Sequence, residues 1–211
     1  MAGTKEKGQE TNERIVQAAT EVFSELGYGG ARVDEIARRA GVNKATLYYH
    51  IGDKKALYAV VLHSVIGHTA ERIEKELGPD TLSPVEKIRA YIRGFAHAIE
   101  HNPRVAPIMM RELASGGKTL PDVVAQDFAR IIAIVTAILK EGYEKGVFIK
   151  VTPFIIHMMA AGCMVFYRAT APVRSKYPYV PKEIKALAPT ISDQVVGEIE
   201  TLILNAIMKR N

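Results

Sequence analysis

The sequence contains a single cysteine and no tryptophan, and its N-terminal residues lack the pattern of a secretory signal. Cys163 is the only cysteine among 211 residues, which excludes an intramolecular disulfide and the small secreted domains that depend on disulfides. The N-terminal stretch MAGTKEKGQETNER is polar and has no apolar run of the about 7 to 15 residues that a secretory signal needs. We therefore expect a cytoplasmic protein.

Long apolar runs and a one-sided charge are missing as well. The most apolar stretch, Val151 to Tyr167, contains Thr152 and His157 and falls short of the about 20 apolar residues that span a bilayer. We interpret it as a buried helix and expect no membrane partner. Residues 1–58 hold 9 basic and 8 acidic side chains, and the remainder holds 19 and 15. The net charge of +5 is therefore spread too thinly to identify a nucleic-acid-binding surface by itself.

Motifs for nucleophilic catalysis and phosphate binding are also absent. The sequence has no G-x-S-x-G turn, no Walker loop and no glycine-rich strand-to-helix turn. Cys163 lies in an apolar segment, where a thiol is normally inert. We expect no enzyme and no cofactor.

One short segment matches a metal-binding motif and leaves an alternative function open. His97-Ala98-Ile99-Glu100-His101 matches H-x-x-E-H, in which two histidines four residues apart could hold Zn²⁺ while Glu100 acts as general base. The sequence singles out no third acidic ligand, and His101 close to a helix end stabilises the helix dipole without a metal. We therefore expect no metal site, and a metal-responsive regulator or a zinc metallopeptidase using these residues is the alternative.

Helical periodicity is abundant, and the alternation typical of strands is almost absent. From Asn12 to Leu26 apolar residues recur every three or four positions, and Gly27 follows where a helix commonly ends. A loop over residues 28–30 then leads to two short helices, Val33 to Ala40 and Lys44 to His50. Two short helices joined by a glycine-containing turn and braced by a longer helix have the proportions of a helix-turn-helix DNA-binding unit.

The segment VDEIARRAGVNKATLYYHIGDKKAL, Val33 to Leu57, resembles the DNA-binding signature of TetR/AcrR-type transcriptional regulators. It combines a turn, a recognition helix and a helix capped by Asp53 at fixed spacing, and the similarity extends back to about Glu13. The rest of the chain is similar to this family only in size and helical character. The resemblance implies a DNA-binding domain over residues 11–58 and a larger helical domain for effector binding and dimerisation over residues 59–211.

The resemblance also implies roles for single residues. The side chains that face the major groove and the flanking backbone are Lys44, Thr46, Tyr48, Tyr49 and His50, although either tyrosine could instead be a packing residue.

Lys54 is implied to meet a phosphate, because it stands at the positive start of the next helix. The sequence departs from the family pattern at two places. Ile51 replaces the usual Phe, and Ala31-Arg32 replaces the usual hydroxyl caps. Arg32 could therefore reach a phosphate while its helix lacks the normal cap.

The chain beyond the signature is predicted to be helical throughout. Ser83 and Glu86 form a capping box with Pro84 at the first helical position, which is a strong start signal. The predicted helices are Lys54 to Leu77, Pro84 to Asn102, Val105 to Ala114, Pro121 to Lys145, Pro153 to Thr170 and Ser192 to Lys209. Four prolines within residues 171–190 predict a loop or a broken short helix there.

The last two long helices are candidates for self-association. An apolar stripe is more often the core of one chain, but a single helix-turn-helix unit binds weakly and gains affinity by spanning two half-sites as a dimer. We expect a four-helix dimer interface that includes Ala161, Val196, Ile199, Leu202, Ile203 and Ile207.

A cavity for an effector would lie among the middle helices. Methionine and aromatic side chains there could adapt to varied ligands, or could simply fill the core. The candidates are Phe95, Met109, Met110, Phe128, Tyr143, Met158, Cys163 and Phe166. Together with the resemblance, this predicts a homodimeric, sequence-specific transcriptional repressor that binds a palindromic double-stranded DNA operator and is released by a small hydrophobic effector.

Overall fold

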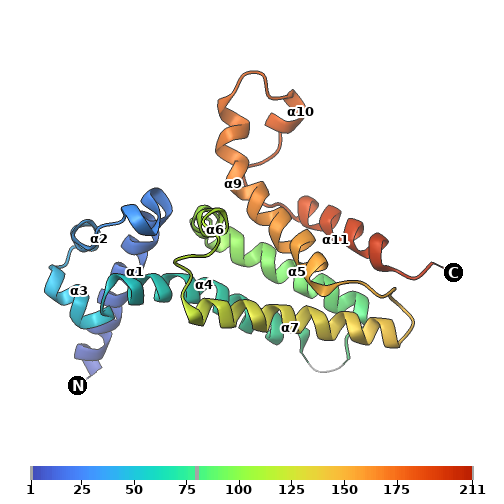
Figure 1. The fold of residues 1–211 in the computed structure, drawn as a ribbon, viewed down its shortest axis with the longest axis horizontal. Coiled ribbons are helices and arrows are strands. Elements are labelled where there is room, and N and C mark those ends of the chain that lie inside the picture. The colour runs from blue at the N-terminus through green and yellow to red at the C-terminus, as the bar shows by residue number, and fades with distance from the viewer. Residues whose placement is uncertain (1, 79–80, 211) are drawn as a thin grey trace.

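The computed structural model describes residues 2–78 and 81–210, with side chains from Gly8 onward, and every regular element within these residues is a helix (Figure 1). This confirms the predicted all-α class. The elements are α1 (Ala2–Gly30), α2 (Val33–Ala40), α3 (Lys44–Ile51), α4 (Lys54–Leu77), α5 (Pro84–His101), α6 (Val105–Ala114), α7 (Asp122–Glu144), α8 (Pro153–His157), the π-helical turn η1 (Met158–Gly162), α9 (Cys163–Lys176), α10 (Lys182–Lys185) and α11 (Asp193–Ile207).

Helix α1 differs from the prediction at both ends. It begins at Ala2, ten residues before Asn12, and it continues through residues 28–30 as a further helical turn where a loop was predicted. The chain bends at Gly27, whose φ of 68° and ψ of 174° lie outside the helical region. Glycine tolerates a positive φ that other residues rarely adopt, so the helix kinks here and resumes in a new direction.

The predicted caps start α3 and α4, and α3 ends at Ile51, one residue beyond the predicted His50. The Asn43 side chain accepts a hydrogen bond from the Thr46 backbone N–H at 2.7 Å, and Asp53 accepts one from the Ala56 N–H at 2.7 Å. Each cap satisfies one of the free N–H groups at a helix start. Gly41 ends α2 in the left-handed region, with a φ of 68°. We call α1 to α3 with the start of α4 the N-terminal head.

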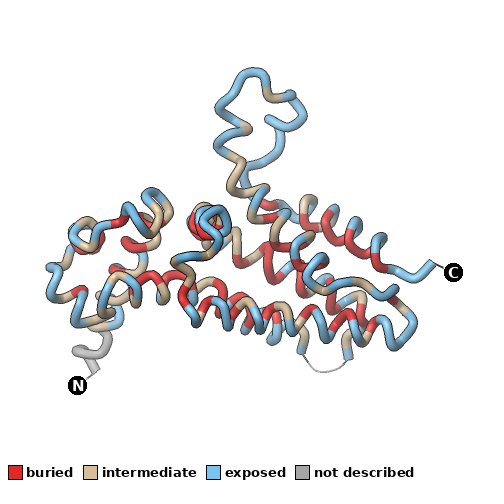
Figure 2. The backbone as a smooth tube through the Cα atoms, viewed as in Figure 1, coloured by how far each residue is buried: buried red, intermediate tan, exposed pale blue. Residues whose placement is uncertain are grey.

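Helix α4 runs from the N-terminal head into the rest of the molecule, the body (Figure 1). In the body, α4, α5 and α7 pack against one another, and their buried residues face inward (Figure 2). Helix α5 starts with the predicted capping box of Ser83 and Glu86. The predicted domain boundary at residue 58 therefore falls inside one continuous helix, so a movement of α4 in the body is also a movement of the head.

Helices α8, η1 and α9 form one continuous helix from Pro153 to Lys176, which is long and apolar enough to cross a membrane by length and composition alone. Only 33% of its most apolar window is buried, so the prediction of a buried helix is wrong for much of its length. Neighbouring helices of the same chain cover one face only. The large apolar side chains that remain exposed on this helix are Phe154, Ile155, Met158, Phe166 and Val173.

The prediction that this helix ends at Thr170 is also wrong, since α9 includes Pro172 and continues to Lys176. The end of α9 and α10 project from the body as an arm (Figure 1). Arg174 holds the base of the arm by donating hydrogen bonds to the carbonyl oxygens of Tyr167 and Ala188, at 2.6 and 3.1 Å.

The predicted dimer interface needs correction. Five of its six residues are buried within a single chain, at 8% exposure or less, because α11 packs on α5 and η1: Ala161, Val196, Ile199, Ile203 and Ile207. They belong to the core of the body and are not available to a partner. Leu202 alone is exposed, at 66%.

Candidate functional site

The exposed side of α3 carries the side chains predicted to contact DNA. Leu47 is fully buried and fixes α3 on the head, which leaves Tyr48 and Tyr49 exposed at 43% and 87%. His50 is half-buried and its ring meets the Tyr49 ring edge-on at 5.4 Å between centroids. Lys44 is exposed and its ammonium lies 3.0 Å from a carboxylate oxygen of Asp34 on α2. The high exposure of Tyr49 therefore gives no support to the alternative that it is a packing residue.

The three remaining predicted contacts lie around α3. Thr46 is half-buried beside the cap of α3. Arg32 is exposed and precedes α2 without a side-chain capping bond, as the departure from the family pattern predicts. Lys54 lies at the start of α4 with its ammonium 4.6 Å from the centre of the Tyr28 ring. This cation–π contact orients Lys54 and leaves the start of α4 ready for an anion.

The arginines of α2 are engaged within the head. Arg38 and Arg39 both bind Glu35, and Arg39 also binds Glu25 on α1 at 2.7 Å. The hydrogen bonds from Arg38 and Arg39 lower the pKa of Glu35 to about 2. These two arginines brace α2 against α1, so the candidate DNA contacts come from α3 and from the starts of α2 and α4.

The position of Lys54 leads to a test of phosphate contact. Lys54→Ala is expected to weaken binding to all double-stranded DNA sequences alike and to reduce the slope of log affinity against log salt by about 1 per lost contact. Lys55→Ala is the matched control, because Lys55 is the neighbouring exposed lysine. Fluorescence anisotropy over a salt series measures both slopes. An unchanged Lys54→Ala slope would contradict the assignment.

A cavity of about 190 Å³ lies in the body between α4, α5, α6, α7 and α9. Six of the eight residues predicted to line an effector pocket line this cavity: Phe95, Met109, Met110, Phe128, Met158 and Phe166. Tyr143 is exposed on the far part of α7, and Cys163 is exposed on α9, so neither lines it. The prediction is wrong for these two because their positions on the helical faces turn them outward.

Sequence reasoning missed the three polar residues of the cavity, which are Thr69, Asn102 and His157. The His157 side chain is buried, and its Nδ1 is 2.8 Å from the hydroxyl of Tyr91, which is also buried. Burial lowers the pKa of His157 to about 4 and raises the pKa of Tyr91. Both groups are therefore uncharged at neutral pH. The only signal in the sequence was a histidine inside an apolar stretch, which does not tell a ligand contact from a core residue.

The low pKa of His157 predicts acid sensitivity. An unfolded histidine titrates near 6.5, so between pH 6.5 and 4 the unfolded chain binds more protons than the folded one. The contribution of His157 to the free energy of unfolding is therefore fully present above pH 6.5. It falls by about 3 kcal/mol as the pH is lowered to 4. Urea unfolding at pH 7 and pH 4.5 measures the loss. His157→Phe should reduce the difference between the two pH values, and an equal difference in both proteins would contradict the assignment.

Helix α6 connects the cavity to the N-terminal head. Its Met109 and Met110 line the cavity, while the guanidinium of the adjacent Arg111 donates to the carbonyl oxygens of Ser24 and Glu25 at 2.6 and 3.0 Å. These two carbonyls are near the kink of α1. A molecule that displaces α6 would therefore move the contact that holds α1.

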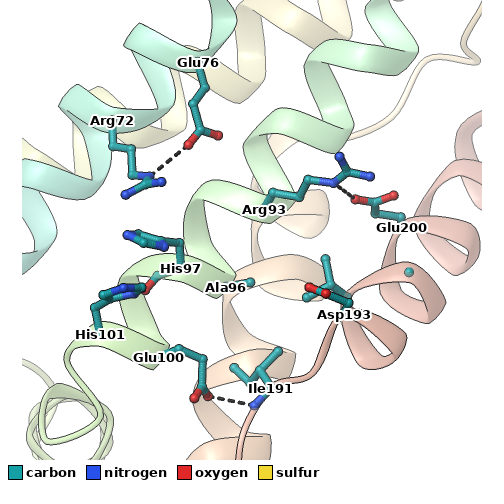
Figure 3. Close-up of a pocket in the computed structure, with 12 residues that line it drawn as sticks. Arg72, Glu76, Arg93, Ala96, His97, Glu100, His101, Ile191, Asp193 and Glu200 are labelled. Carbon is teal, nitrogen blue, oxygen red and sulfur yellow. Dashed lines mark hydrogen bonds and ion pairs between the residues drawn. The ribbon is translucent and has the colours of Figure 1, made fainter.

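The H-x-x-E-H residues border a separate open hollow of about 650 Å³ between α4, α5 and α11 (Figure 3). The His97 and His101 rings contact each other with centroids 3.5 Å apart. Glu100 points away from them and accepts a hydrogen bond from the Ile191 backbone N–H at 2.7 Å (Figure 3). Among the described residues, no group of three His, Cys, Asp or Glu side chains is arranged to hold a metal ion. This geometry contradicts the general-base role that the metallopeptidase alternative assigns to Glu100.

Comparison with known proteins identifies both parts of the chain. The family described as "Bacterial regulatory proteins, tetR family" matches residues 15–61, and "Tetracyclin repressor-like, C-terminal domain" matches residues 84–177. The HTH-type transcriptional regulator RutR of Escherichia coli K12 is 27% identical over 158 residues, which are 75% of this chain and 74% of RutR.

Solved structures share the fold over almost the whole chain. The hemolysin II transcriptional regulator HlyIIR superposes with a TM-score of 0.71 at 22% identity, covering 96% of this chain and 99% of HlyIIR. The transcriptional regulator FadR from Bacillus subtilis, solved in complex with stearoyl-CoA, has a TM-score of 0.68 at 20% identity and covers 91% and 97% of the two chains.

The two family models together cover about two thirds of the chain, including the α3 surface and most of the cavity. They also overturn the metallopeptidase alternative, in agreement with the orientation of Glu100. The chain belongs to the TetR family of DNA-binding transcriptional regulators, with an N-terminal helix-turn-helix domain and a TetR-like C-terminal domain.

Proposed function

We propose that this regulator is a repressor that binds a palindromic operator as a homodimer and leaves it when a small hydrophobic molecule enters the cavity of the body. The observation that carries the proposal is the sharing of helices between cavity and head. Val65, Ile66 and Thr69 of α4 line the cavity, and the same helix begins at Lys54 in the head. Helix α6 lines the cavity and holds α1 through Arg111.

Release from DNA requires a difference in affinity. A ligand shifts the head away from its DNA-binding position only if it binds the DNA-incompetent conformation more tightly than the competent one. The walls of the cavity support such coupling, because α4 and α6 line it and each of them also reaches the head. The relative FadR, whose structure contains stearoyl-CoA, supports a hydrophobic effector as a class for this fold. A zinc-responsive mechanism has less support, since His97 and His101 supply only two imidazoles.

The exposed face of α8 and α9, together with Leu202 of α11, is the proposed dimer interface. It presents exposed apolar side chains outside the cavity, among them Phe154, Ile155 and Val173. Patches of large exposed apolar side chains commonly mark protein–protein contacts. This interface replaces the buried residues that the sequence pattern predicted and keeps the same helices.

Disrupting this face should produce a monomer. Leu202→Arg places a charge in the proposed contact and is expected to weaken dimerisation by at least about tenfold, because an unpaired charge in an interface is costly. Analytical ultracentrifugation measures the dimer dissociation constant. Thr201→Arg, at the neighbouring exposed position, is the control for added charge. Equal dissociation constants in wild type and Leu202→Arg would contradict the interface.

Selection of bound sequences from a random DNA pool tests the function as a whole. A palindromic consensus with half-sites spaced by about one helical turn, or a multiple of it, is expected for a two-fold symmetric helix-turn-helix dimer. A single non-repeated half-site would overturn the dimeric mode of binding. Failure to enrich any sequence would overturn sequence-specific recognition.

A further inference from the structure

The polar side chains that line the cavity of the body are Thr69, Asn102 and His157. Of the side chains that line it, all within the described residues, none is Asp, Glu, Lys or Arg. Thr69 already donates to the carbonyl oxygen of Val65 at 2.6 Å, and Asn102 donates to that of Ala98 at 3.3 Å. His157 is different, because Nδ1 contacts Tyr91 while Nε2 has no hydrogen-bond partner among the described residues.

The contact with Tyr91 determines which nitrogen of His157 carries the proton. The Tyr91 hydroxyl is buried and His157 is its hydrogen-bond partner, so its hydrogen is satisfied only when the hydroxyl donates to Nδ1. A neutral imidazole that accepts at Nδ1 carries its proton at Nε2. The ring therefore offers an N–H donor to a molecule in the cavity. Edge-on contact with Phe95 at 5.4 Å between ring centroids keeps the imidazole in this orientation.

The backbone around His157 also serves the cavity. His157 immediately precedes the π-helical turn η1, and π-turns of this kind are frequent at functional sites. Met158, Ala161 and Gly162 of the same turn line the cavity, and Gly162 has no side chain to fill it. The π-helical turn thus places the imidazole of His157 and the space left by Gly162 on the same wall of the cavity.

We propose that the effector of this protein is an uncharged molecule of about one ring, with a carbonyl or comparable acceptor that receives a hydrogen bond from His157 Nε2. The proposal rests on the proposed ligand-controlled function and names the class of ligand. A volume of about 190 Å³ is slightly larger than the roughly 150 Å³ engineered cavity that binds benzene. A carboxylate is excluded from the class, since the cavity supplies no cation to compensate its desolvation.

Three probes of nine non-hydrogen atoms each separate shape, acceptor and charge. Acetophenone has a ring and a carbonyl, cumene has the same outline without the acceptor, and benzoate has the ring with a negative charge. Isothermal titration calorimetry on the full-length wild type at pH 7.5 is expected to give a dissociation constant for acetophenone about tenfold lower than for cumene, as one neutral hydrogen bond provides. Benzoate should bind at least about a hundredfold more weakly than acetophenone.

Variants of His157 identify the donor. His157→Phe keeps a planar ring and removes the N–H, so it should bind acetophenone and cumene equally, whereas His157→Gln keeps an N–H donor and should retain part of the preference. His101→Phe, an exposed histidine outside the cavity, is the matched control and should behave as wild type. Thermal unfolding without ligand identifies a variant that fails to fold. In that case the ranking of the three dissociation constants in the wild type still tests the proposed ligand class.

Each outcome separates this proposal from the proposed function. Equal binding of acetophenone and cumene by wild type, stronger binding of benzoate, or no binding of any probe overturns the ligand class. A preference for acetophenone that persists in His157→Phe overturns the role of His157. Operator binding is measured separately by anisotropy with and without acetophenone. If acetophenone binds through His157 but never weakens operator binding, the ligand class stands and ligand-controlled release is wrong.

Discussion

Tyr49→Ala is expected to lower affinity for the operator by about tenfold or more while leaving thermal stability unchanged. The ring is 87% exposed and meets the ring of its neighbour His50, so its loss removes almost no packing within the described residues. On DNA, one lost contact of a recognition helix costs about 1 to 3 kcal/mol, and both copies of a dimer lose it. Anisotropy with the selected operator measures affinity, and thermal unfolding measures stability.

The control for Tyr49→Ala is Tyr179→Ala, which removes another highly exposed tyrosine, 79% exposed, from the arm beyond α9. Its operator affinity should equal that of wild type. A loss of affinity in both variants would indicate a general effect of removing exposed rings. Unchanged affinity in Tyr49→Ala would show that this side of α3 does not face DNA.

Tyr58→Ala is expected to reduce the free energy of unfolding by about 3 to 5 kcal/mol, the usual cost of deleting a buried aromatic ring. Tyr58 is 1% exposed on α4, and its ring contacts Phe23 and Tyr28 of α1 at 4.8 and 4.9 Å between centroids. Its hydroxyl donates to the buried carboxylate of Glu112 on α6 at 2.6 Å. Burial and this hydrogen bond raise the pKa of Tyr58, so the hydroxyl remains a donor at all ordinary pH values.

Tyr58→Phe separates packing from hydrogen bonding. It keeps the ring and leaves Glu112 with Thr119 as its remaining side-chain partner, which should cost about 1 to 3 kcal/mol. Tyr143→Ala, at an exposed tyrosine of α7, should change stability by less than about 0.5 kcal/mol. Urea unfolding followed by circular dichroism gives all three values. A cost of Tyr58→Ala no larger than that of Tyr143→Ala would show that α1, α4 and α6 are not joined at this residue.

The joint at Tyr58 has a functional consequence beyond stability. It connects the first helix of the head, the helix that runs between head and body, and the helix that lines the cavity. Together with Arg111 on the adjacent position of α6, it makes two contacts through which a displaced α6 would reach the head. Variants at Tyr58 should therefore lower the stability of the fold and also reduce the effect of the ligand on operator affinity.

Local chemistry explains which parts of the fold were predictable. The caps at Asn43, Asp53 and Ser83 each join residues three positions apart, so the sequence contains both partners of each hydrogen bond. The same holds for Leu47, whose burial follows from the short apolar core of the helix-turn-helix unit. The kink at Gly27 was misjudged because a positive φ permits either a stop or a bend, and contacts with α6 on the body accompany the bend.

Amphipathic stripes predict that a face is covered but do not identify what covers it. Ile203 and Ile207 were assigned to a partner, and they pack inside the body, whereas Phe154 and Ile155 were expected in a buried helix and stand exposed. Burial depends on which helices lie opposite, and those helices are far away along the chain. For the same reason the sequence named six residues of the cavity but not His157.

The sequence by itself determined the all-helical class, the order of most helices, the helix-turn-helix unit and the side chains that α3 presents. These depend on contacts within a few residues, where propensity, caps and turns decide the outcome. Only the tertiary structure decided that the α11 stripe is core, that α8 and α9 expose an apolar face, and that His157 and Tyr91 meet in the cavity. Those features join residues as far apart as 107 positions, and their energies arise only when the helices pack.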